Sequence, residues 1–294
     1  MASEFFTRRE DCPLCGSDEK QTLYSSSFES PELRRYIDES HNELPEGFFE
    51  GVDYTVLKCK RCGFIWQPNV LNEGGIKVIY EAYKKSDEMA KERSKSRVRQ
   101  IYSKQLEDLL RALGKPPNQL RVLDYGMGWG HWALTAKELG CKSYGFEVSK
   151  KCRDFAAEKG IEVLERNEIG GEGPFNIINL EQVLEHVPDP KELLQFLSGN
   201  LAEGGIMVIG VPNGEGVEKL LKKPGYKVGK DAVWPLQHIN CFRGSNLRDL
   251  VASANLSPTR MPPIRTLKNL VRSCLRHLPP YRNLSFRVYV TQSP

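Results

Sequence analysis

A short glycine-rich turn is the first stretch of this sequence whose residue types and spacing suggest chemistry. Asp124 follows the apolar residues 122–123, and Gly126, Gly128 and Gly130 come at every second position after it. Glycine is needed where a backbone adopts positive φ or lies directly against a ligand, because it has no Cβ. The stretch therefore predicts the end of a buried strand, a turn that contacts a ligand, and a helix that begins near residue 131.

A second acidic residue ends the next predicted strand. Residues 143–146 form that strand and deliver Glu147 to the same end of the sheet as the glycine turn. An acidic residue about 20 positions beyond such a turn binds the ribose hydroxyls in nucleotide-binding folds. We therefore predict a nucleoside cofactor. Read from Gly128, the segment to Ala133 also fits the dinucleotide pattern G-x-G-x-x-G/A, so these two features leave NAD open.

Four cysteines in two matching C-x-x-C-G motifs predict a metal site: Cys12, Cys15, Cys59 and Cys62. The spacing lets both thiolates of a motif reach one tetrahedral ion, and the glycine after it permits a tight turn. Four sulfur ligands are typical of a closed, structural zinc site with no open position for substrate. The alternatives are four unrelated thiols or a redox pair, but two matching copies favour a shared Zn²⁺ that supports folding.

The elements that must position these residues alternate along the chain. Strands are expected at 160–164, 175–180 and 206–211, with helices at 149–159, 191–201 and 245–254. This alternation predicts an α/β fold with a doubly wound, mostly parallel sheet. We expect a small zinc-ribbon-like domain at 1–70, a helical connector at 71–119, and the main domain at 120–294.

Composition limits the class of protein. The chain has 294 residues, eight cysteines and a formal net charge of +4, which is too small to indicate nucleic-acid binding by itself. Residues 1–11 are polar and charged, and no apolar run is long enough to span a bilayer. We expect a cytoplasmic protein whose cysteines are metal ligands and core thiols.

The residues that follow the glycine turn resemble a known enzyme family. The order of Asp124-x-Gly-x-Gly-x-Gly130, Glu147, Leu180-Glu-Gln-Val-Leu-Glu-His-Val-Pro-Asp-Pro190 and a strand ending Val-Pro-Asn213 resembles class I S-adenosylmethionine-dependent methyltransferases over residues 120–255. With the cysteine motifs, the whole chain is similar to a subgroup with an N-terminal zinc-binding domain, which includes sugar and natural-product methyltransferases. The resemblance implies S-adenosylmethionine as cofactor and a small-molecule acceptor, phosphorylated or nucleotide-linked.

The resemblance also implies roles for single residues. Gly126, Gly128 and Gly130 would bring backbone against the methionine part of the cofactor, and Asp124 would hold its amino group. Glu147 would bind the ribose diol.

Further cofactor contacts are expected from three other places. Asn167 stands where many relatives carry Asp, and it would contact the adenine. Leu180 and Glu181 would border the sulfonium through backbone groups. Tyr80 and Tyr83, on the helix expected at 76–83, would cover the cofactor, although ordinary packing explains them equally well.

Two histidines compete to be the general base that an acceptor hydroxyl or carbon acid requires. His238 lies in the segment after the strand at 206–211, which faces the substrate in the family that the chain resembles. His186 follows the strand at 175–180, and its alternative is a packing role at a helix entry. Residues 214–233 lack periodicity and predict a mobile loop over the substrate.

A basic helical insertion is expected at 263–279, with apolar residues at helical spacing beside Arg265, Lys268 and Arg272. A surface helix is its plain interpretation. The other interpretations are that it binds a phosphate-bearing substrate, the surface of an anionic membrane, or RNA.

An RNA methyltransferase is the weaker enzymatic alternative, because the cysteine segment lacks interleaved aromatic and basic residues. A cofactor-binding protein without catalysis also fits the fold. The oligomeric state is left open.

Overall fold

A seven-stranded sheet forms the larger part of the molecule. The computed structural model describes residues 4–82, 96–229, 232–259 and 286–293. The sheet has the order β12-β13-β10-β9-β6-β7-β8. Its strands are β6 (Arg121–Tyr125), β7 (Lys142–Phe146), β8 (Glu162–Val163), β9 (Phe175–Glu181), β10 (Leu201–Val211), β12 (Leu256–Pro258) and β13 (Phe286–Gln292). The five strands from β8 to β10 run parallel, and β13 pairs antiparallel with both neighbours. The predicted mostly parallel α/β fold is confirmed.

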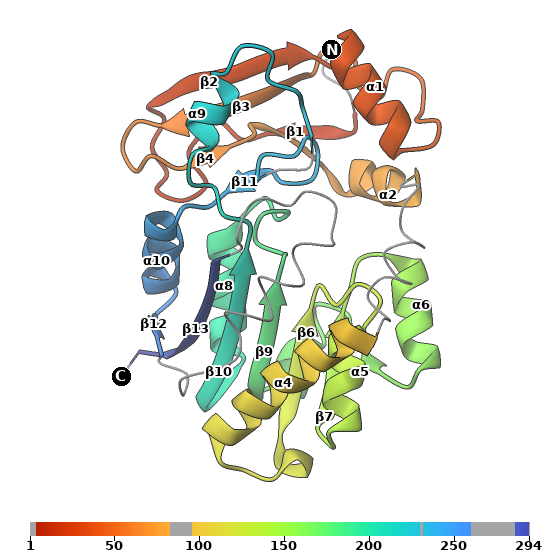
Figure 1. Cartoon of the computed structure of the whole chain (residues 1–294), viewed down its shortest axis with the longest axis vertical. Coiled ribbons are helices and arrows are strands. Elements are labelled where there is room, and N and C mark those ends of the chain that lie inside the picture. The colour runs from red at the N-terminus through yellow and green to blue at the C-terminus, as the bar shows by residue number, and fades with distance from the viewer. Residues whose placement is uncertain (1–3, 83–95, 230–231, 260–285, 294) are drawn as a thin grey trace.

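Helices cover both faces of this sheet (Figure 1). One face carries α4 (Ser96–Leu113) and α5 (His131–Glu138), and the other carries α8 (Pro190–Gly199) and α10 (Gly244–Ser253). Two further helices, α6 (Lys150–Glu158) and the short α7 (Ile169–Glu172), connect strands. Helix α5 begins at His131, as the glycine pattern predicts.

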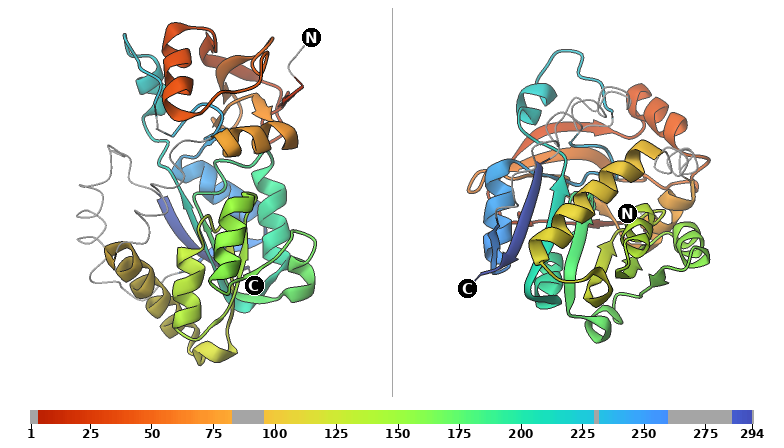
Figure 2. Two further views of the ribbon diagram at one scale, coloured as in Figure 1. Left: turned by 90° about the vertical axis from the view of Figure 1, so that its right-hand side faces the viewer. Right: turned by 60° about the horizontal axis from the view of Figure 1, so that its bottom comes forward.

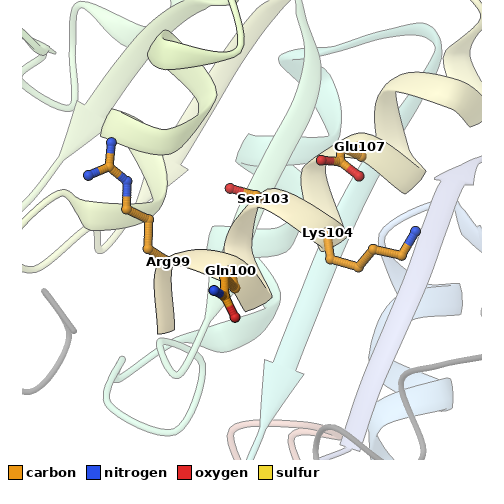
Figure 3. A pocket seen from close by; sticks show the side chains of 5 residues that line it. All are labelled: Arg99, Gln100, Ser103, Lys104 and Glu107. Atoms are coloured by element: carbon orange, nitrogen blue, oxygen red, sulfur yellow. The ribbon is translucent and has the colours of Figure 1, made fainter. Parts of the chain in front are cut away.

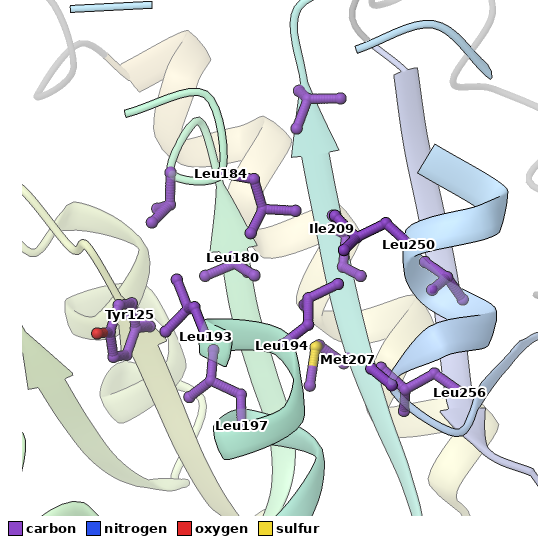
Figure 4. Packing of buried hydrophobic residues seen from close by; sticks show 14 of the residues in the cluster. Tyr125, Leu180, Leu184, Leu193, Leu194, Leu197, Met207, Ile209, Leu250 and Leu256 are labelled. Carbon is purple, nitrogen blue, oxygen red and sulfur yellow. The ribbon is translucent and has the colours of Figure 1, made fainter. Parts of the chain in front are cut away.

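The alternation of side chains along the strands divides the core into two layers. Ile177 and Val208 pack with α4 and α5, whereas Ile178 and Ile209 belong to the layer under α8 and α10. Figure 4 shows the second layer, in which Leu193, Leu194 and Leu197 of α8 lie against the sheet. Consecutive strand residues point to opposite faces, so a sheet covered on both sides needs apolar residues at nearly every position.

A smaller N-terminal module lies beyond one end of the sheet (Figures 1 and 2). It contains β1 (Phe6–Arg8), β2 (Lys20–Ser27), α1 (Pro31–Ser40), β3 (Asp53–Cys59), β4 (Ile65–Trp66), β5 (Asn69–Leu71) and α2 (Glu73–Ala82). Strands β1 and β5 pair with each other, and β2, β3 and β4 form a separate antiparallel sheet. In Figure 1 the carboxyl ends of β9 and β10 point toward this module.

Two segments from much later in the sequence complete this module. Strand β11 (Asn240–Cys241) pairs antiparallel with β4, and α9 (Val217–Leu221) contacts β2. The loop expected at 214–233 thus contains a helix in its described part. Val217, Leu221 and Val233 are buried in the core of the N-terminal module, so this part of the segment is packed, whereas its mobility and its contact with the substrate stay predictions.

The basic insertion at 263–279 and Tyr83 lie outside the described residues. The division into regions at residues 70 and 119 stays a prediction. Among the described residues, no helix is long and apolar enough to cross a membrane.

Arg9 links the N-terminal module to the segments at the end of the large sheet. Its guanidinium donates hydrogen bonds to the carbonyls of Gln67 at 2.6 Å, Pro188 at 2.9 Å and Ile239 at 3.0 Å, and to Oδ1 of Asn240 at 2.9 Å. Burial lowers the pKa of Arg9 to about 10, so the group stays protonated at neutral pH. One cation therefore satisfies acceptors from three separate segments.

Replacing Arg9 with methionine should lower the free energy of unfolding by about 2–4 kcal/mol, because buried carbonyl groups lose their donor. The neighbouring Arg8 is a matched control: its side chain is 56% exposed and pairs with Glu10 in solvent. Arg8→Met should change stability by no more than about 0.5 kcal/mol. Urea unfolding followed by tryptophan fluorescence measures both, and equal effects of the two changes would contradict the linking role.

Candidate functional site

The glycine turn and Glu147 are joined by a hydrogen bond. The backbone N–H of Gly128 donates to Oε2 of Glu147 at 2.8 Å, and the N–H of Ser149 donates to Oε1 at 2.9 Å. Strands β6 and β7 are parallel neighbours with Asp124 opposite Gly145, so their carboxyl ends meet at one edge. The two features that predicted a nucleoside site from the sequence thus lie side by side.

The turn itself depends on glycine. Gly126, Gly128 and Gly130 have φ of 74°, 54° and 70°, which side chains rarely tolerate. At Gly126 a Cβ would lie 2.6 Å from Cγ2 of Val183, so there is no room for a side chain. The N–H groups of Gly126 and Met127 donate to the carbonyl of Phe146, which holds the turn against β7.

Asp124 sits at the end of β6, deep in the same edge of the sheet. Its side chain is 3% exposed, and its Oδ1 accepts a hydrogen bond from Nδ2 of Asn179 at 2.8 Å. Asn179 belongs to β9, on the other side of β6. The amide therefore fixes this carboxylate beneath the glycine turn.

The residues that end β9 are held in different ways. The side chain of Leu180 is buried in the core, and Glu181 forms a two-point ion pair with Arg287 of β13, with Nη2 and Oε2 2.7 Å apart. The next residue, Gln182, has φ of 58°, and its N–H donates to the carbonyl of Gly210. The chain turns sharply here and leaves the backbone of 180–182 at the sheet edge.

Two other residues expected near the cofactor, Asn167 and Tyr80, lie outside the glycine turn. Asn167 is exposed between β8 and α7. Tyr80 of α2 is 45% exposed, yet desolvation and then the charges of Glu147 and Glu185 raise the pKa of its hydroxyl. Helix α2 thus brings Tyr80 near both carboxylates.

Glu185, His186 and His238 form a compact cluster beyond the end of β9. Their nearest ligand atoms, one from each residue, all lie within 4.8 Å of one another. Nε2 of His186 is 3.9 Å from Oε1 of Glu185, and the two imidazole rings meet edge to face at 5.0 Å. Both candidate base histidines therefore belong to one site, together with a carboxylate to which the sequence analysis gave no role.

Glu185 and His238 are buried and His186 is partly buried, and burial changes the protonation of the cluster. Glu185 is fully buried, which raises its pKa to about 8, helped by the nearby charge of Glu181 and opposed by a hydrogen bond with its own backbone. Burial lowers the pKa of His186 to about 4, against a hydrogen bond with the backbone of Gln237. In the folded protein at neutral pH, both groups are therefore mostly uncharged.

Two amides from outside the cluster position it. Asn240 donates from Nδ2 to the carbonyls of Leu184 at 2.9 Å and Val187 at 2.7 Å, on either side of Glu185 and His186. Gln67, just after β4, donates from Nε2 to the carbonyls of Trp234 at 2.9 Å and His238 at 2.8 Å. The N-terminal module thereby holds the turn that carries His238.

The four cysteines of the two C-x-x-C motifs also come together. Their sulfur atoms lie within 4.8 Å of one another, with Cys12 to Cys62 and Cys15 to Cys59 both at 3.6 Å. Sulfur ligands of a tetrahedral zinc ion with bonds of about 2.3 Å are roughly 3.8 Å apart, so the arrangement matches a four-sulfur site. Burial would raise the pKa of Cys59, but hydrogen bonds from Cys62 and its neighbours lower it to about 7.

A surface concavity of about 500 Å³ lies away from all these residues. It is lined by Arg99, Gln100, Ser103, Lys104 and Glu107, all on α4 (Figure 3). None of them comes from a strand end, where ligands bind in open α/β sheets. We therefore assign it no function.

The comparisons with known proteins agree with this geometry. Residues 96–260 match the family described as "Methyltransferase domain". Two curated relatives are the ubiquinone biosynthesis O-methyltransferases of Caulobacter sp. (strain K31) and Caulobacter vibrioides. The first is 33% identical over 111 residues, 34% of this chain and 44% of that protein. The second is 32% identical over 108 residues, 33% and 43% of the two chains. The match thus spans less than half the length of these relatives.

Solved structures with a similar fold include two methyltransferases. The magnesium protoporphyrin IX methyltransferase of Synechocystis PCC 6803, with bound SAH, is 15% identical, with a TM-score of 0.46 over 67% of this chain and 84% of that one. The 1,6-didemethyltoxoflavin-N1-methyltransferase of Burkholderia thailandensis is 17% identical, with a TM-score of 0.47 over 71% and 83%.

Replacing Gly126 with alanine should destabilise the fold by about 2 kcal/mol, because a side chain would meet both the positive φ and Val183. Gly171→Ala is the control, since it lies in helix α7 and a Cβ there meets nothing within 4 Å. The double variant Gly126→Ala with Val183→Ala should recover only the steric part. Urea unfolding midpoints report all three, and an unchanged Gly126→Ala midpoint would refute the constraint.

Proposed function

This chain belongs to the methyltransferase-domain family, and from that premise we propose that it transfers a methyl group from S-adenosylmethionine to a small-molecule acceptor. The observation that supports this most directly is the hydrogen bond between Gly128 and Glu147. It places an acidic side chain and an open stretch of backbone at one edge of a parallel sheet, where nucleotide cofactors bind.

The residues at this edge fit an adenosine-bearing cofactor. Each oxygen of Glu147 accepts one backbone N–H, which leaves lone pairs for the two hydroxyls of a ribose. The glycines put backbone without side chains next to it, and Asp124 would receive the amino group of the methionine part. Val148, 57% exposed, and Tyr80 offer apolar surface to the flat face of a purine.

Two further cofactor contacts remain part of the proposal. The backbone of Leu180 and Glu181 would border the sulfonium, since the side chain of Glu181 is already paired with Arg287. Asn167 would reach the adenine from its exposed turn, and Tyr83, outside the described residues, would add to the cover that Tyr80 provides.

The cofactor supplies an electrophilic methyl group on a cationic sulfur, so the protein must hold a nucleophile in line with it and take up its proton. We propose that the cluster of Glu185, His186 and His238 takes up that proton. His186 is a weak base there, because burial lowers its pKa to about 4. His238 is therefore the first candidate for the proton acceptor.

We propose that the acceptor is a small molecule that is methylated on an oxygen atom. The curated relatives are named O-methyltransferases, although the match covers less than half of their length. A phosphorylated or nucleotide-linked acceptor, an RNA strand or a membrane surface would all depend on residues 263–279. Those residues lie outside the described part, and no observation on the described residues favours RNA.

We also propose that the N-terminal cysteine cluster binds one Zn²⁺ as a structural ion. Four sulfur atoms at mutual distances suited to a tetrahedral site leave no position for a substrate. Its role is then to hold the two cysteine turns together, and through β4 the segment that carries His238.

Glu147→Gln should weaken the binding of S-adenosylmethionine and S-adenosylhomocysteine by roughly 10- to 100-fold, the loss expected for hydrogen bonds to a charged group. Isothermal titration calorimetry measures the change. Glu158, an exposed carboxylate at the end of α6, is the control, and Glu158→Gln should bind as the wild type does. Tight NAD binding in place of S-adenosylmethionine would overturn the proposal.

Cys12→Ser should remove most of the bound zinc and lower the thermal midpoint, because a three-sulfur site holds the ion less well. Plasma mass spectrometry should find one zinc per wild-type chain. Cys141→Ser changes a buried cysteine outside the cluster and should keep the zinc. A metal-free protein that folds fully would contradict the site.

A further inference from the structure

We propose that Glu185, His186 and His238 bind a second divalent metal ion, distinct from the four-sulfur site, with coordination positions left open for an oxygen of the acceptor. The residue set is two imidazoles and one carboxylate, which is the ligand set of catalytic zinc sites and of non-haem iron sites. Three protein ligands leave at least one position free. The four-cysteine cluster, by contrast, is closed.

The geometry is close to that of a bound state. One ligand atom from each residue lies within 4.8 Å of the other two. Ligands of a single ion with bonds of about 2.0–2.2 Å lie roughly 3–4 Å apart, so small side-chain rotations bring the three atoms to that spacing. The Nε2–Oε1 distance of 3.9 Å between His186 and Glu185 already falls within it.

The buried carboxylate is the observation that points to a cation. Glu185 is 0% exposed, and neither of its side-chain oxygens accepts a hydrogen bond from another residue. A buried polar group without a partner costs about 1–3 kcal/mol, and more when it is charged. Nε2 of His186 lies 3.9 Å from Oε1 of Glu185, and an imidazole nitrogen binds metals through its lone pair. An ion between the two groups satisfies both.

The surrounding structure is built to hold this arrangement. Asn240 fixes the backbone on both sides of Glu185 and His186, and Gln67 fixes the carbonyl of His238. His186 also forms a hydrogen bond with the backbone of Gln237. Ligating histidines characteristically use their second ring nitrogen in this way, which orients the ring.

The chemistry of the ligands selects the class of ion. Imidazole and carboxylate suit zinc, iron, cobalt or manganese, and they suit calcium and magnesium less well. An ion held by these residues would lower the pKa of an acceptor hydroxyl bound to it, so that the hydroxyl would release its proton to water before its oxygen attacks the methyl group. This second part rests on the proposed methyl transfer. With the ion bound, His238 acts as a ligand and no longer as the base.

Manganese is the probe that separates the two metal sites, because Mn²⁺ binds nitrogen and oxygen ligands and avoids thiolates. Protein that carries one zinc per chain, in the four-sulfur site, should take up one Mn²⁺ per chain, seen by electron paramagnetic resonance as loss of the free-ion signal, with a dissociation constant below about 100 μM. Zn²⁺ should displace it, since zinc ranks above manganese in affinity for such ligands.

Three variants locate the ion. Glu185→Gln and His238→Ala should each weaken Mn²⁺ binding by at least about tenfold. His131→Gln and Glu158→Gln change residues of the same types outside the cluster and should bind Mn²⁺ as the wild type does. Circular dichroism and S-adenosylhomocysteine binding check that each variant is folded. No saturable Mn²⁺ uptake by the wild type, or equal uptake by Glu185→Gln and His238→Ala, would overturn the proposal.

The same samples distinguish the two proposals. If S-adenosylhomocysteine binds and Mn²⁺ does not, the metal site is wrong and the proposed function stands. If Mn²⁺ binds at the cluster and neither form of the cofactor binds, the proposed function is wrong and the metal site stands.

Discussion

The hydrogen bond from the backbone of Gly128 to Glu147 is the constraint on which the rest of the site depends. It joins the turn after β6 to the end of β7, and a second N–H, from Ser149, holds the other carboxylate oxygen. A carboxylate fixed by two backbone amides cannot rotate away from the edge of the sheet. The parallel pairing of β6 with β7 and β9 brings it there, and Asn179 fixes Asp124 from the opposite side.

Local signals predicted much of this architecture. The glycine turn, the start of α5 and the alternation of strands and helices depend on residues close together in the chain, so a sequence pattern can reveal them. The packing of the segment 214–233 was missed for the opposite reason. Val217, Leu221 and Val233 lie in a stretch without sustained helical or strand periodicity, yet they are buried because their partners come from the N-terminal module. Contacts between distant segments leave no local pattern.

The candidate site was predictable residue by residue but not as a group. His186 and His238 could each be proposed as a base from the residues around them in the sequence. No local pattern indicated that their rings lie 5.0 Å apart with Glu185 beside them. That contact depends on Asn240 and on the pairing of β11 with β4, residues far apart in the chain. A histidine four or five residues after a strand is weak evidence alone. A buried carboxylate facing it is much stronger.

The position of the N-terminal module gives the cysteine cluster a consequence for the site beyond its own folding. The second cysteine motif leads directly into β4, and β4 is followed by Gln67, which holds the turn of His238. Asn246 of α10 also donates to the carbonyl of Cys62 at 3.1 Å, and Arg243 donates to that of Gly63. The motif is therefore fastened to the large domain on both sides of its turn. A change in the positions of the sulfur atoms should therefore shift His238, because only β4 and Gln67 lie between the second cysteine motif and the turn that carries this histidine. In this way a closed metal site can support a reaction although it does not contact the substrate.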